Sequence, residues 1–328
     1  AMAGADTDTV KAVMDCLNTT EAVRILKGKG LLQDVMKTVM ERIEFYLRQR
    51  AGEELQIGAI VFSSEEGILG QTAMSGIFTG AGVGPGDPEL MTLKAVRAIE
   101  ECSVIAIPVS DSTLEAPVYE TAGSEDGRNE AYLERCVAYQ IAVGASPETA
   151  EKDRIYLPMP MIKEKERLKA IHDQDAEAVA QLLDEDKNVV FLTLGDPTVY
   201  STCMYVHKRL KRAGYTTQII PGIPSFCAAA ARMDIPLVEN RQELHVLPAS
   251  YDIEESLHLP GTKVLMKAGR KMGEVKRLLT EKEMDAVMVE NCGMENEKIY
   301  SGAEEIPEQA GYYSLLVVKE KQTGGRER

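Results

Sequence analysis

Apolar runs and amphipathic segments alternate along most of the chain from about residue 77 onward. Short continuous apolar runs, such as residues 189–192, are typical of parallel strands, which are buried on both faces. Between these runs, residues 88–102 and 162–184 carry apolar positions at helical spacing. The expected strands of this part are residues 77–83, 103–108, 188–194 and 216–220. The alternation predicts a mainly parallel sheet with helices on both faces.

After about residue 241 the expected strands follow one another more closely. They are residues 243–247, 262–267, 285–289, 298–300 and 313–319, with one clear helix among them at 271–279. This spacing predicts a mixed sheet in a second α/β domain. Residues 116–153 are polar, acidic and rich in glycine, so we expect an excursion over the surface. Residues 321–328 are expected to form a disordered tail.

The first 73 residues follow a different pattern. Residues 30–52 carry apolar positions at helical spacing, a shorter capped helix ends at Gly28, and residues 55–61 alternate as a half-buried strand. Such a small α/β piece is thin for an independent core. We therefore expect three parts: a partial domain at 1–73, an N-terminal α/β domain at 74–195 and a C-terminal α/β domain at 196–320.

Charge and cysteine usage exclude several functional classes. Among 328 residues, 52 acidic side chains outnumber 37 basic ones, giving a net charge of −15. This argues against non-specific binding to nucleic acid or to anionic membranes. No apolar run approaches 18 residues and no signal peptide is visible, so we expect a cytoplasmic protein that does not interact with membranes. The six cysteines form no CxxC pair, so we expect reduced thiols and no protein-bound metal.

A turn rich in glycine and proline joins the first of these strands to the first helix. Its sequence is Gly82-Val-Gly-Pro-Gly-Asp-Pro-Glu89. A dinucleotide fingerprint needs a third glycine at the helix start, where this chain has Asp87. Asp87 is a natural helix cap with Pro88 in the first helical position, and its carboxylate repels a pyrophosphate. The turn therefore suits a ligand without phosphates.

Two further turns of this kind follow later strands. Residues 195–201 follow the strand at 188–194, and residues 221–225 follow the strand at 216–220. Each turn then opens a helix. Three glycine and proline turns at the carboxyl ends of strands in one sheet indicate an open α/β ligand site.

These residues closely resemble the tetrapyrrole methylases, which transfer a methyl group from S-adenosylmethionine (SAM). Residues 74–88 are similar to the start of such enzymes, and the resemblance extends to about residue 320. Residues 193–205 and 246–249 most resemble the members that methylate carbon 20 of precorrin-2 or cobalt-precorrin-2 in cobalamin biosynthesis. A methylase of another ring carbon, or a tetrapyrrole-binding protein without catalysis, remains as an alternative.

The resemblance implies a homodimer of two-domain subunits with SAM in the cleft between the domains. Carried over by position, the implied SAM contacts are Pro85, Leu194, Gly195, Asp196, Val199, Pro224, Ser225, Met266 and Cys292. Two of them depart from many relatives, because Pro224 stands where Ser or Thr is common and Cys292 where Gly is common. Both contacts survive if backbone groups make them, although Pro224 has no N–H to donate.

Methyl transfer from a sulfonium to carbon needs alignment more than strong acids or bases. Tyr200 is the candidate assisting group, and packing or SAM contact is its alternative role. The tetrapyrrole of these enzymes carries eight carboxylates, so a chain at −15 must concentrate positive charge locally. Lys267 and Arg270 are the candidate substrate-binding residues, with a solvated surface cluster as the alternative. Any cobalt arrives within the substrate.

The N-terminal part has a resemblance of its own. Residues 18–22, 30–32 and 60–63 are similar to the C-terminal end of cobalt-precorrin-5B carbon-1 methyltransferases. This resemblance implies that residues 1–73 are the remnant of a second enzyme of the same pathway, fused ahead of the methylase and lacking its own active site.

Overall fold

The computed structural model describes residues 76–124, 129–248 and 252–320. The chain divides into two units at residues 68 and 69, and all described residues belong to the second. The partial domain expected at 1–73 and the tail expected at 321–328 lie outside the described residues.

A mainly parallel sheet of six strands forms the first half of the described chain, as the sequence predicts. Its order is β3-β4-β2-β5-β1-β6, and only the β3–β4 pair is antiparallel. The strands are β1 (Phe78–Gly82), β2 (Val104–Val109), β3 (Val118–Glu120), β4 (Asp153–Pro158), β5 (Val189–Thr193) and β6 (Thr217–Ile220). The interior strand β1 pairs with β5 and β6, and its five residues are all buried.

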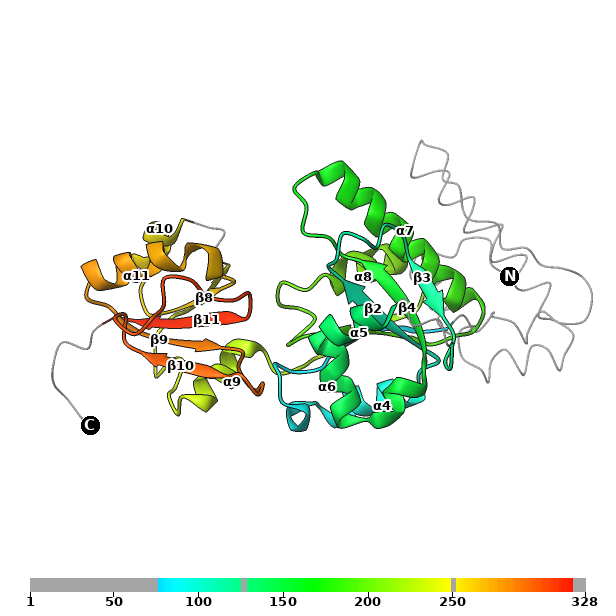
Figure 1. Cartoon of the computed structure of the whole chain (residues 1–328), viewed down its shortest axis with the longest axis horizontal. Helices are drawn as coiled ribbons and strands as arrows, with labels where there is room; N and C mark the ends of the chain where they lie inside the picture. Colours follow the sequence, from blue (N-terminus) through cyan, green and yellow to red (C-terminus); the bar gives the residue numbers. More distant parts are fainter. Residues whose placement is uncertain (1–75, 125–128, 249–251, 321–328) are drawn as a thin grey trace, which may run out of the picture. The chain divides into compact units, whose positions relative to one another are not determined.

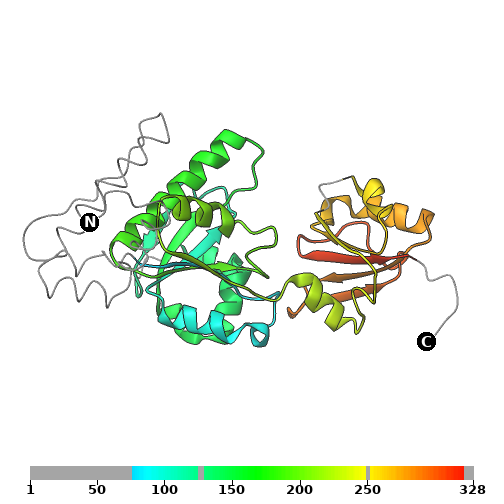
Figure 2. The ribbon, with the colours of Figure 1, turned by 180° about the vertical axis from the view of Figure 1, so that it is seen from behind.

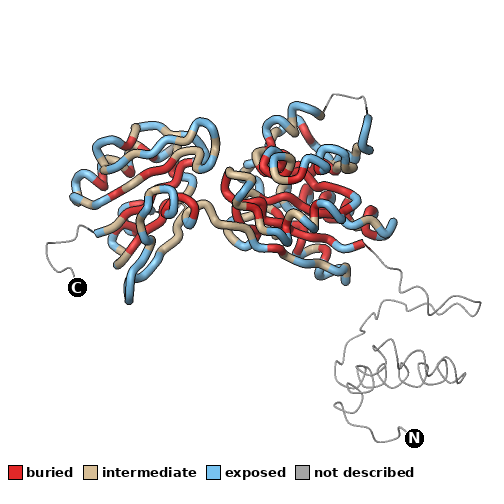
Figure 3. The backbone as a smooth tube through the Cα atoms, turned by 90° about the horizontal axis from the view of Figure 1, so that it is seen from below, coloured by how far each residue is buried: buried red, intermediate tan, exposed pale blue. Residues whose placement is uncertain are grey.

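Helices cover both faces of this sheet (Figures 1 and 2). One face packs on α4 (Leu93–Glu101) and α6 (Val137–Ala145) through residues such as Ile105 and Leu192. The other packs on α7 (Lys165–Asp184) and α8 (Cys203–Arg212) through alternate strand residues such as Ala106 and Phe191. The interior strands β1, β2 and β5 are almost entirely buried (Figure 3), which explains their continuous apolar runs.

The second sheet is mixed, again as predicted. Its order is β10-β9-β11-β8-β7, in which only β7 and β8 are parallel. The strands are β7 (Leu244–Pro248), β8 (Thr262–Met266), β9 (Asp285–Glu290), β10 (Lys298–Ser301) and β11 (Ser314–Lys319). One face packs on α10 (Ile253–Leu257) and α11 (Met272–Glu281), and the other on α9 (Ser225–Arg232).

The structure corrects four details of the sequence prediction. The helix expected at 88–102 is interrupted: the short 3₁₀ helix η1 (Pro88–Leu90) ends first, and the side chain of Thr92 then caps α4. The short helix α10 was not expected. The boundary expected at 195/196 falls inside the first α/β part, because α8 and β6 belong there and β6 pairs with β1.

The largest correction concerns residues 116–153, which we expected to be a surface excursion. They contain β3, α5 (Glu130–Arg135), α6, the 3₁₀ helix η3 (Pro147–Glu151) and the start of β4. Four residues of α6 are buried against the sheet. This segment is therefore part of the core and supplies an edge of the sheet.

Candidate active site

The three turns rich in glycine and proline lie side by side because their strands are neighbours. β5, β1 and β6 are adjacent and parallel, so all three turns follow the carboxyl ends of strands at the same edge. Backbone bonds join the first two turns: the N–H of Gly195 donates to the carbonyl of Gly84 at 2.7 Å, and the N–H of Gly84 donates back at 3.4 Å. The arrangement expected from the sequence is present.

Glycine is required where the turns touch. A Cβ atom on Gly222 would lie 2.1 Å from the carbonyl oxygen of Gly195 and 2.9 Å from the backbone of Gly82. A Cβ atom on Gly82 would likewise lie 2.5 Å from the Gly222 nitrogen. Both distances are shorter than any ordinary contact, so side chains at these positions would force the turns apart.

Asp196 braces the second turn against the third. One carboxylate oxygen accepts the backbone N–H of Thr198 at 2.8 Å, and the other accepts the N–H of Gly222 at 3.0 Å. The side chain is nearly buried. Its carboxylate is thus committed to the protein itself.

Asp87 caps a helix as the sequence predicts. Its carboxylate accepts the N–H of Glu89 at 2.9 Å, and Pro88 begins η1. The preceding Gly86 fits closely against the loop after β9, because a Cβ there would lie 2.3 Å from the Cys292 carbonyl oxygen. The first turn therefore meets the backbone of the loop that follows strand β9 of the second sheet.

A cavity of about 290 Å³ opens at the ends of these strands. Its lining comes from the first two turns, the start of α9, α5 and α6, and the ends of β8, β9 and β11. The described lining residues include no aspartate or glutamate, whereas the chain as a whole carries −15. The positively charged side chains among them are Arg135 and Lys267.

Most of the residues predicted for the site line this cavity. The members are Pro85, Leu194, Gly195, Val199, Ser225, Met266 and Cys292 of the expected cofactor set, together with Tyr200 and Lys267. Asp196 and Pro224 of that set are not among its lining residues; Pro224 instead precedes α9 as its N-cap. Arg270 lies in the 3₁₀ helix η4 (Gly269–Lys271), and its side chain lies outside the described part.

Tyr200 occupies the second turn with a strained backbone. Its φ is +49°, in the left-handed region that side chains other than glycine or asparagine rarely adopt. The side chain is half exposed, and its hydroxyl donates to the carbonyl of Val246 in β7 at 3.0 Å. The phenol oxygen thus ties the second turn to the second sheet while the residue lines the cavity.

Lys267 also has a left-handed backbone, with φ of +60° directly after β8. Its ammonium lies 5.4 Å from the centroid of the Tyr312 ring, within the range of a cation–π interaction. Tyr312 and Tyr313 both line the cavity and pack edge to face, 5.3 Å apart. This cation is therefore supported by aromatic surface.

Cys292 lines the cavity from a loop fixed by Glu297. The carboxylate of Glu297 accepts the N–H of Gly293 at 2.7 Å and the guanidinium of Arg232 at 2.6 Å. Burial by itself raises the pKa of Glu297, but these two donors outweigh it and hold the pKa below its usual range. Burial and the neighbouring Glu297 raise the pKa of the Cys292 thiol to about 11, so this cysteine is a neutral wall residue.

The lining fits S-adenosylmethionine. A Cβ on Gly195, which has φ of +73°, would have no neighbouring atom closer than 3.9 Å, so the missing side chain leaves open space at the end of β5. Apolar side chains such as Met266 and Val199, with backbone groups of the turns, form the walls. Small-molecule pockets combine apolar walls with a few polar groups in this way.

Other parts of the lining were missed by sequence reasoning. Arg135, Cys136, Val137 and Ala138 come from the segment that we expected at the surface. The apolar run at 136–143 was the available signal.

In the described residues no three metal-ligating side chains gather, and none of the described helices has the length and apolar character needed to cross a membrane.

Comparison with known proteins gives the family. Residues 78–307 match the family described as Tetrapyrrole (Corrin/Porphyrin) Methylases. A "Probable cobalt-precorrin-2 C(20)-methyltransferase" of Methanocaldococcus jannaschii is 34% identical over 244 residues, covering 73% of this chain and 94% of the relative. A "Precorrin-2 C(20)-methyltransferase" of Sinorhizobium is 30% identical over 260 residues, covering 75% and 97%.

Solved structures share the fold. Cobalt precorrin-4 methyltransferase aligns with a TM-score of 0.53 at 16% identity, covering 77% of this chain and 98% of that structure. Uroporphyrin-III C-methyl transferase from Thermus thermophilus, complexed with S-adenyl homocysteine, aligns with a TM-score of 0.51 at 20% identity, covering 75% and 97%.

Residues 1–73 match a different family, described as CbiD, C-terminal domain. This match ends where the sequence pattern changes, and it agrees with the resemblance noted for this segment. The match at 78–307 covers most of the described residues. The two relatives align with this chain over almost their whole length. From residue 78 onward the chain therefore belongs to the tetrapyrrole (corrin/porphyrin) methylases and is a methyltransferase.

Proposed function

We propose that this protein transfers a methyl group from SAM to carbon 20 of precorrin-2 or cobalt-precorrin-2, in cobalamin biosynthesis. The observation that carries the proposal is the likeness, at 30–34% identity and over nearly their full length, to relatives that are named for this activity. The cavity supports it, because seven of nine expected SAM-binding residues line one space.

We propose that SAM lies against the three turns. Pro85, Leu194, Gly195, Val199 and Ser225 would hold it, with Met266 and Cys292 as the opposite wall. Asp196 contributes indirectly: its carboxylate accepts backbone N–H groups and so fixes the turns that carry these residues. Pro224 contributes by starting α9 directly before Ser225.

When bound, SAM would supply an activated sulfonium methyl: its S–CH₃ bond would break with the electron pair staying on sulfur as the bond to the ring carbon forms, and that carbon would lose its proton to water. The protein aligns the two carbons and excludes water. Tyr200 is proposed to position the tetrapyrrole ring for the transfer, while its own hydroxyl donates to the Val246 carbonyl. Lys267 and Arg270 are proposed to meet carboxylate arms, and the functional unit is proposed to be a homodimer.

The experiment is incubation of the full chain with SAM carrying a ¹³C-methyl group and with each of precorrin-2 and cobalt-precorrin-2. We expect one new methyl on carbon 20, located by ¹³C NMR, and the preferred form of the substrate is read from the two turnover rates. A methyl on another carbon would identify a neighbouring reaction of the same family. SAM binding measured by calorimetry without any turnover would instead indicate a tetrapyrrole-binding protein.

A further inference from the structure

The charge of the cavity sets it apart from the rest of the molecule. Its described lining contains two cations and no carboxylate in a chain of net charge −15. One of the two, Arg135, belongs to the segment between β2 and β4, which no sequence motif singled out. An arginine can bind a carboxylate through two parallel N–H donors, and this geometry makes it more selective than a lysine.

Arg135 is held at its place by a fixed acidic partner. It is the last residue of α5, and its Nη1 donates to the carboxylate of Asp111 at 2.7 Å. Asp111 is itself fixed, because its other oxygen accepts the N–H of Thr113 at 3.0 Å and the Thr113 hydroxyl at 2.8 Å. These bonds hold the pKa of Asp111 below its usual range. The carboxylate is thus ionised and in position to orient the guanidinium.

Most of the guanidinium remains available. The Arg135 side chain is 71% exposed, and its only hydrogen bond within the described part of the chain is the one to Asp111. A guanidinium has five N–H donors, so one bond to Asp111 leaves a pair of donors for a second carboxylate.

Helix α5 is anchored to the sheet at two points. Within the helix, the Tyr132 hydroxyl lies 3.0 Å from the Thr113 hydroxyl, and the Tyr132 ring packs 5.9 Å from that of Tyr156 in β4. Directly before its N-terminal end, Asn129 donates to the carboxylate of Glu120 in β3 at 2.7 Å. Arg135 therefore sits on an element whose position the sheet decides.

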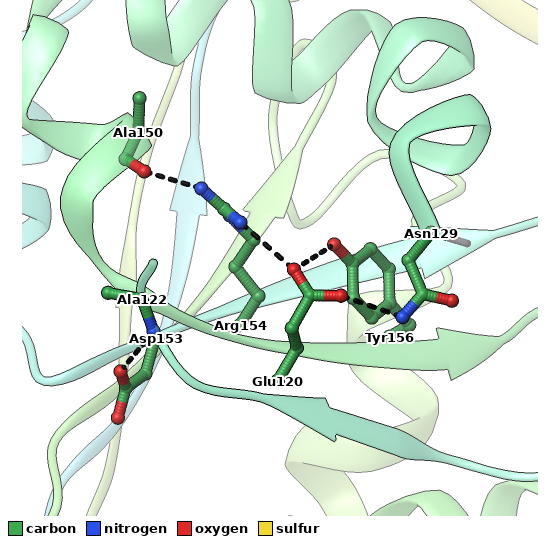
Figure 4. Close-up of polar contacts among 7 residues, drawn as sticks. All are labelled: Glu120, Ala122, Asn129, Ala150, Asp153, Arg154 and Tyr156. Atoms are coloured by element: carbon green, nitrogen blue, oxygen red, sulfur yellow. Dashed lines mark hydrogen bonds and ion pairs between the residues drawn. The ribbon is translucent and has the colours of Figure 1, made fainter. Parts of the chain in front are cut away.

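The anchoring point is a nearly buried polar cluster (Figure 4). The Glu120 carboxylate accepts from Arg154 at 3.1 Å, from the Tyr156 hydroxyl at 3.3 Å and from Asn129. The Glu120 and Arg154 side chains are 11% and 13% exposed, so the ion pair is shielded from solvent. Such a shielded cluster fixes the β3–β4 edge more firmly than a surface pair does, although Nε of Arg154 has no hydrogen-bond partner among the described residues.

We propose that Arg135 determines substrate specificity by binding a carboxylate arm of the tetrapyrrole. Asp111 is a positioning residue: it accepts a hydrogen bond from one edge of the guanidinium, so that another edge is directed toward the carboxylate arm. The segment between β2 and β4 thus serves as a recognition wall. The proposal rests on the proposed function, because it takes the acidic tetrapyrrole as the ligand of this same cavity.

The test compares wild type, Arg135→Gln, Arg135→Lys and a matched control in the full chain. The control is Arg209→Gln, which removes an arginine from another ion pair, Arg209–Asp173 at 2.6 Å, on α7 and α8 away from the lining residues. We expect Arg135→Gln to raise KM for the tetrapyrrole about tenfold or more, with kcat and KM for SAM within twofold of wild type. Arg135→Lys should recover part of the loss, and Arg209→Gln should show none.

Salt separates a charge contact from a packing defect. The difference in KM between wild type and Arg135→Gln should shrink as NaCl rises from 50 to 500 mM, because screening weakens a solvent-accessible ion pair. An unchanged tetrapyrrole KM in Arg135→Gln, or an equal rise in both KM values, would overturn the proposal.

A binding measurement keeps this result separate from failure of the proposed reaction. Uroporphyrin, a stable tetrapyrrole with eight carboxylates, is titrated with each variant and followed by its fluorescence. We expect wild type and Arg209→Gln to bind it equally and Arg135→Gln to bind it about tenfold more weakly, even if precorrin-2 is not turned over. Equal binding by all variants, or no binding by wild type, contradicts the role of Arg135.

Discussion

Tyr200 at the site and Asp175 in α7 show how the surroundings of a single residue decide its role. Tyr200 accepts a left-handed backbone, which costs a residue other than glycine roughly 1 kcal/mol or more. Its bond to the Val246 carbonyl compensates and fixes the ring beside the cavity. Because the hydroxyl is already engaged, we infer that Tyr200 positions substrate more than it moves protons.

Tyr200→Phe tests this role, because it removes the hydroxyl and keeps the ring. We expect kcat to fall less than tenfold, with a small loss of stability of about 1 kcal/mol for one hydrogen bond. Tyr200→Ala should lower kcat further, since the ring is lost. The measurement is steady-state kinetics with thermal unfolding of each variant. A loss of 1000-fold or more in Tyr200→Phe would show that the hydroxyl takes part in the proton transfer.

Asp175 in α7 has a buried carboxyl group, and no hydrogen bond within the described residues compensates for its burial. Neither of its oxygens has a hydrogen-bond partner in the described residues, and His172 Nδ1 lies 3.5 Å away. Burial raises the pKa of Asp175, and the opposing effect of His172 does not cancel it. Below the usual pKa near 4 the group is protonated in both folded and unfolded chains. As pH rises past that value, only the unfolded chain ionises freely, so the free energy of unfolding falls.

Asp175→Asn should therefore stabilise the protein at neutral pH by roughly 1 kcal/mol or more, and the gain should vanish near pH 3.5. The neighbouring Asp173→Asn is the control with the opposite sign. Its carboxylate bonds to Arg209, which holds the pKa of Asp173 below its usual range. Chemical denaturation at several pH values measures both. A lower stability of Asp175→Asn at pH 7.5 would mean that the carboxylate forms a favourable pair with His172.

At the scale of elements, the site depends on backbone contact among the turns that follow β1, β5 and β6. Gly82, Gly195 and Gly222 approach so closely that their backbones replace side-chain packing. The turns after β1 and β5 carry part of the cavity lining, so their relative position helps to set its shape. Asp196 then secures this arrangement through the Gly222 N–H.

Gly222→Ala should disrupt this contact, because its Cβ would lie 2.1 Å from the Gly195 carbonyl oxygen. We expect a destabilisation of about 1–3 kcal/mol, in the range of an overpacked site, and loss of SAM binding by calorimetry. Gly273→Ala is the matched control. It lies within α11 with its nearest neighbour 3.6 Å away, so the change should be neutral or stabilising by up to about 1 kcal/mol. Normal SAM affinity in Gly222→Ala would show that the turns tolerate separation.

At the scale of the molecule, the chain joins a methylase to a segment of different ancestry. The relative from Methanocaldococcus jannaschii is covered to 94% by 73% of this chain. Little of that relative is left to correspond to residues 1–73, which match a separate family. The methylase part should therefore act without this segment.

Deletion of residues 1–73 is expected to leave kcat and both KM values within about twofold of the full chain. The rate is measured with SAM and the preferred precorrin, after circular dichroism has shown that the shortened chain is folded. A folded but inactive truncation would show that the segment belongs to the catalytic unit.

Hydrophobic periodicity was sufficient to predict the elements that are buried in a regular pattern. The buried strands β1, β2 and β5 and the amphipathic α7 appear within a few residues of their predicted bounds. Nine of the eleven described strands were predicted, and β3 and β4 were not. Helix α6 was missed because it is apolar around most of its circumference, so its residues show neither a helical nor a strand period. Strand β3 has three residues and lies at the sheet edge, too short for a pattern.

The sequence by itself determined the layer architecture and the three turns, because strand periodicity, Asp87 capping and glycine spacing are local properties of the chain. It also carried the resemblance that named the SAM-contacting residues. Only the tertiary structure decided which of them share a cavity and that Asp196 is used as a brace. It also placed Arg135 and Lys267 in the lining of that cavity. These facts depend on contacts between residues far apart in the chain, which no local pattern encodes.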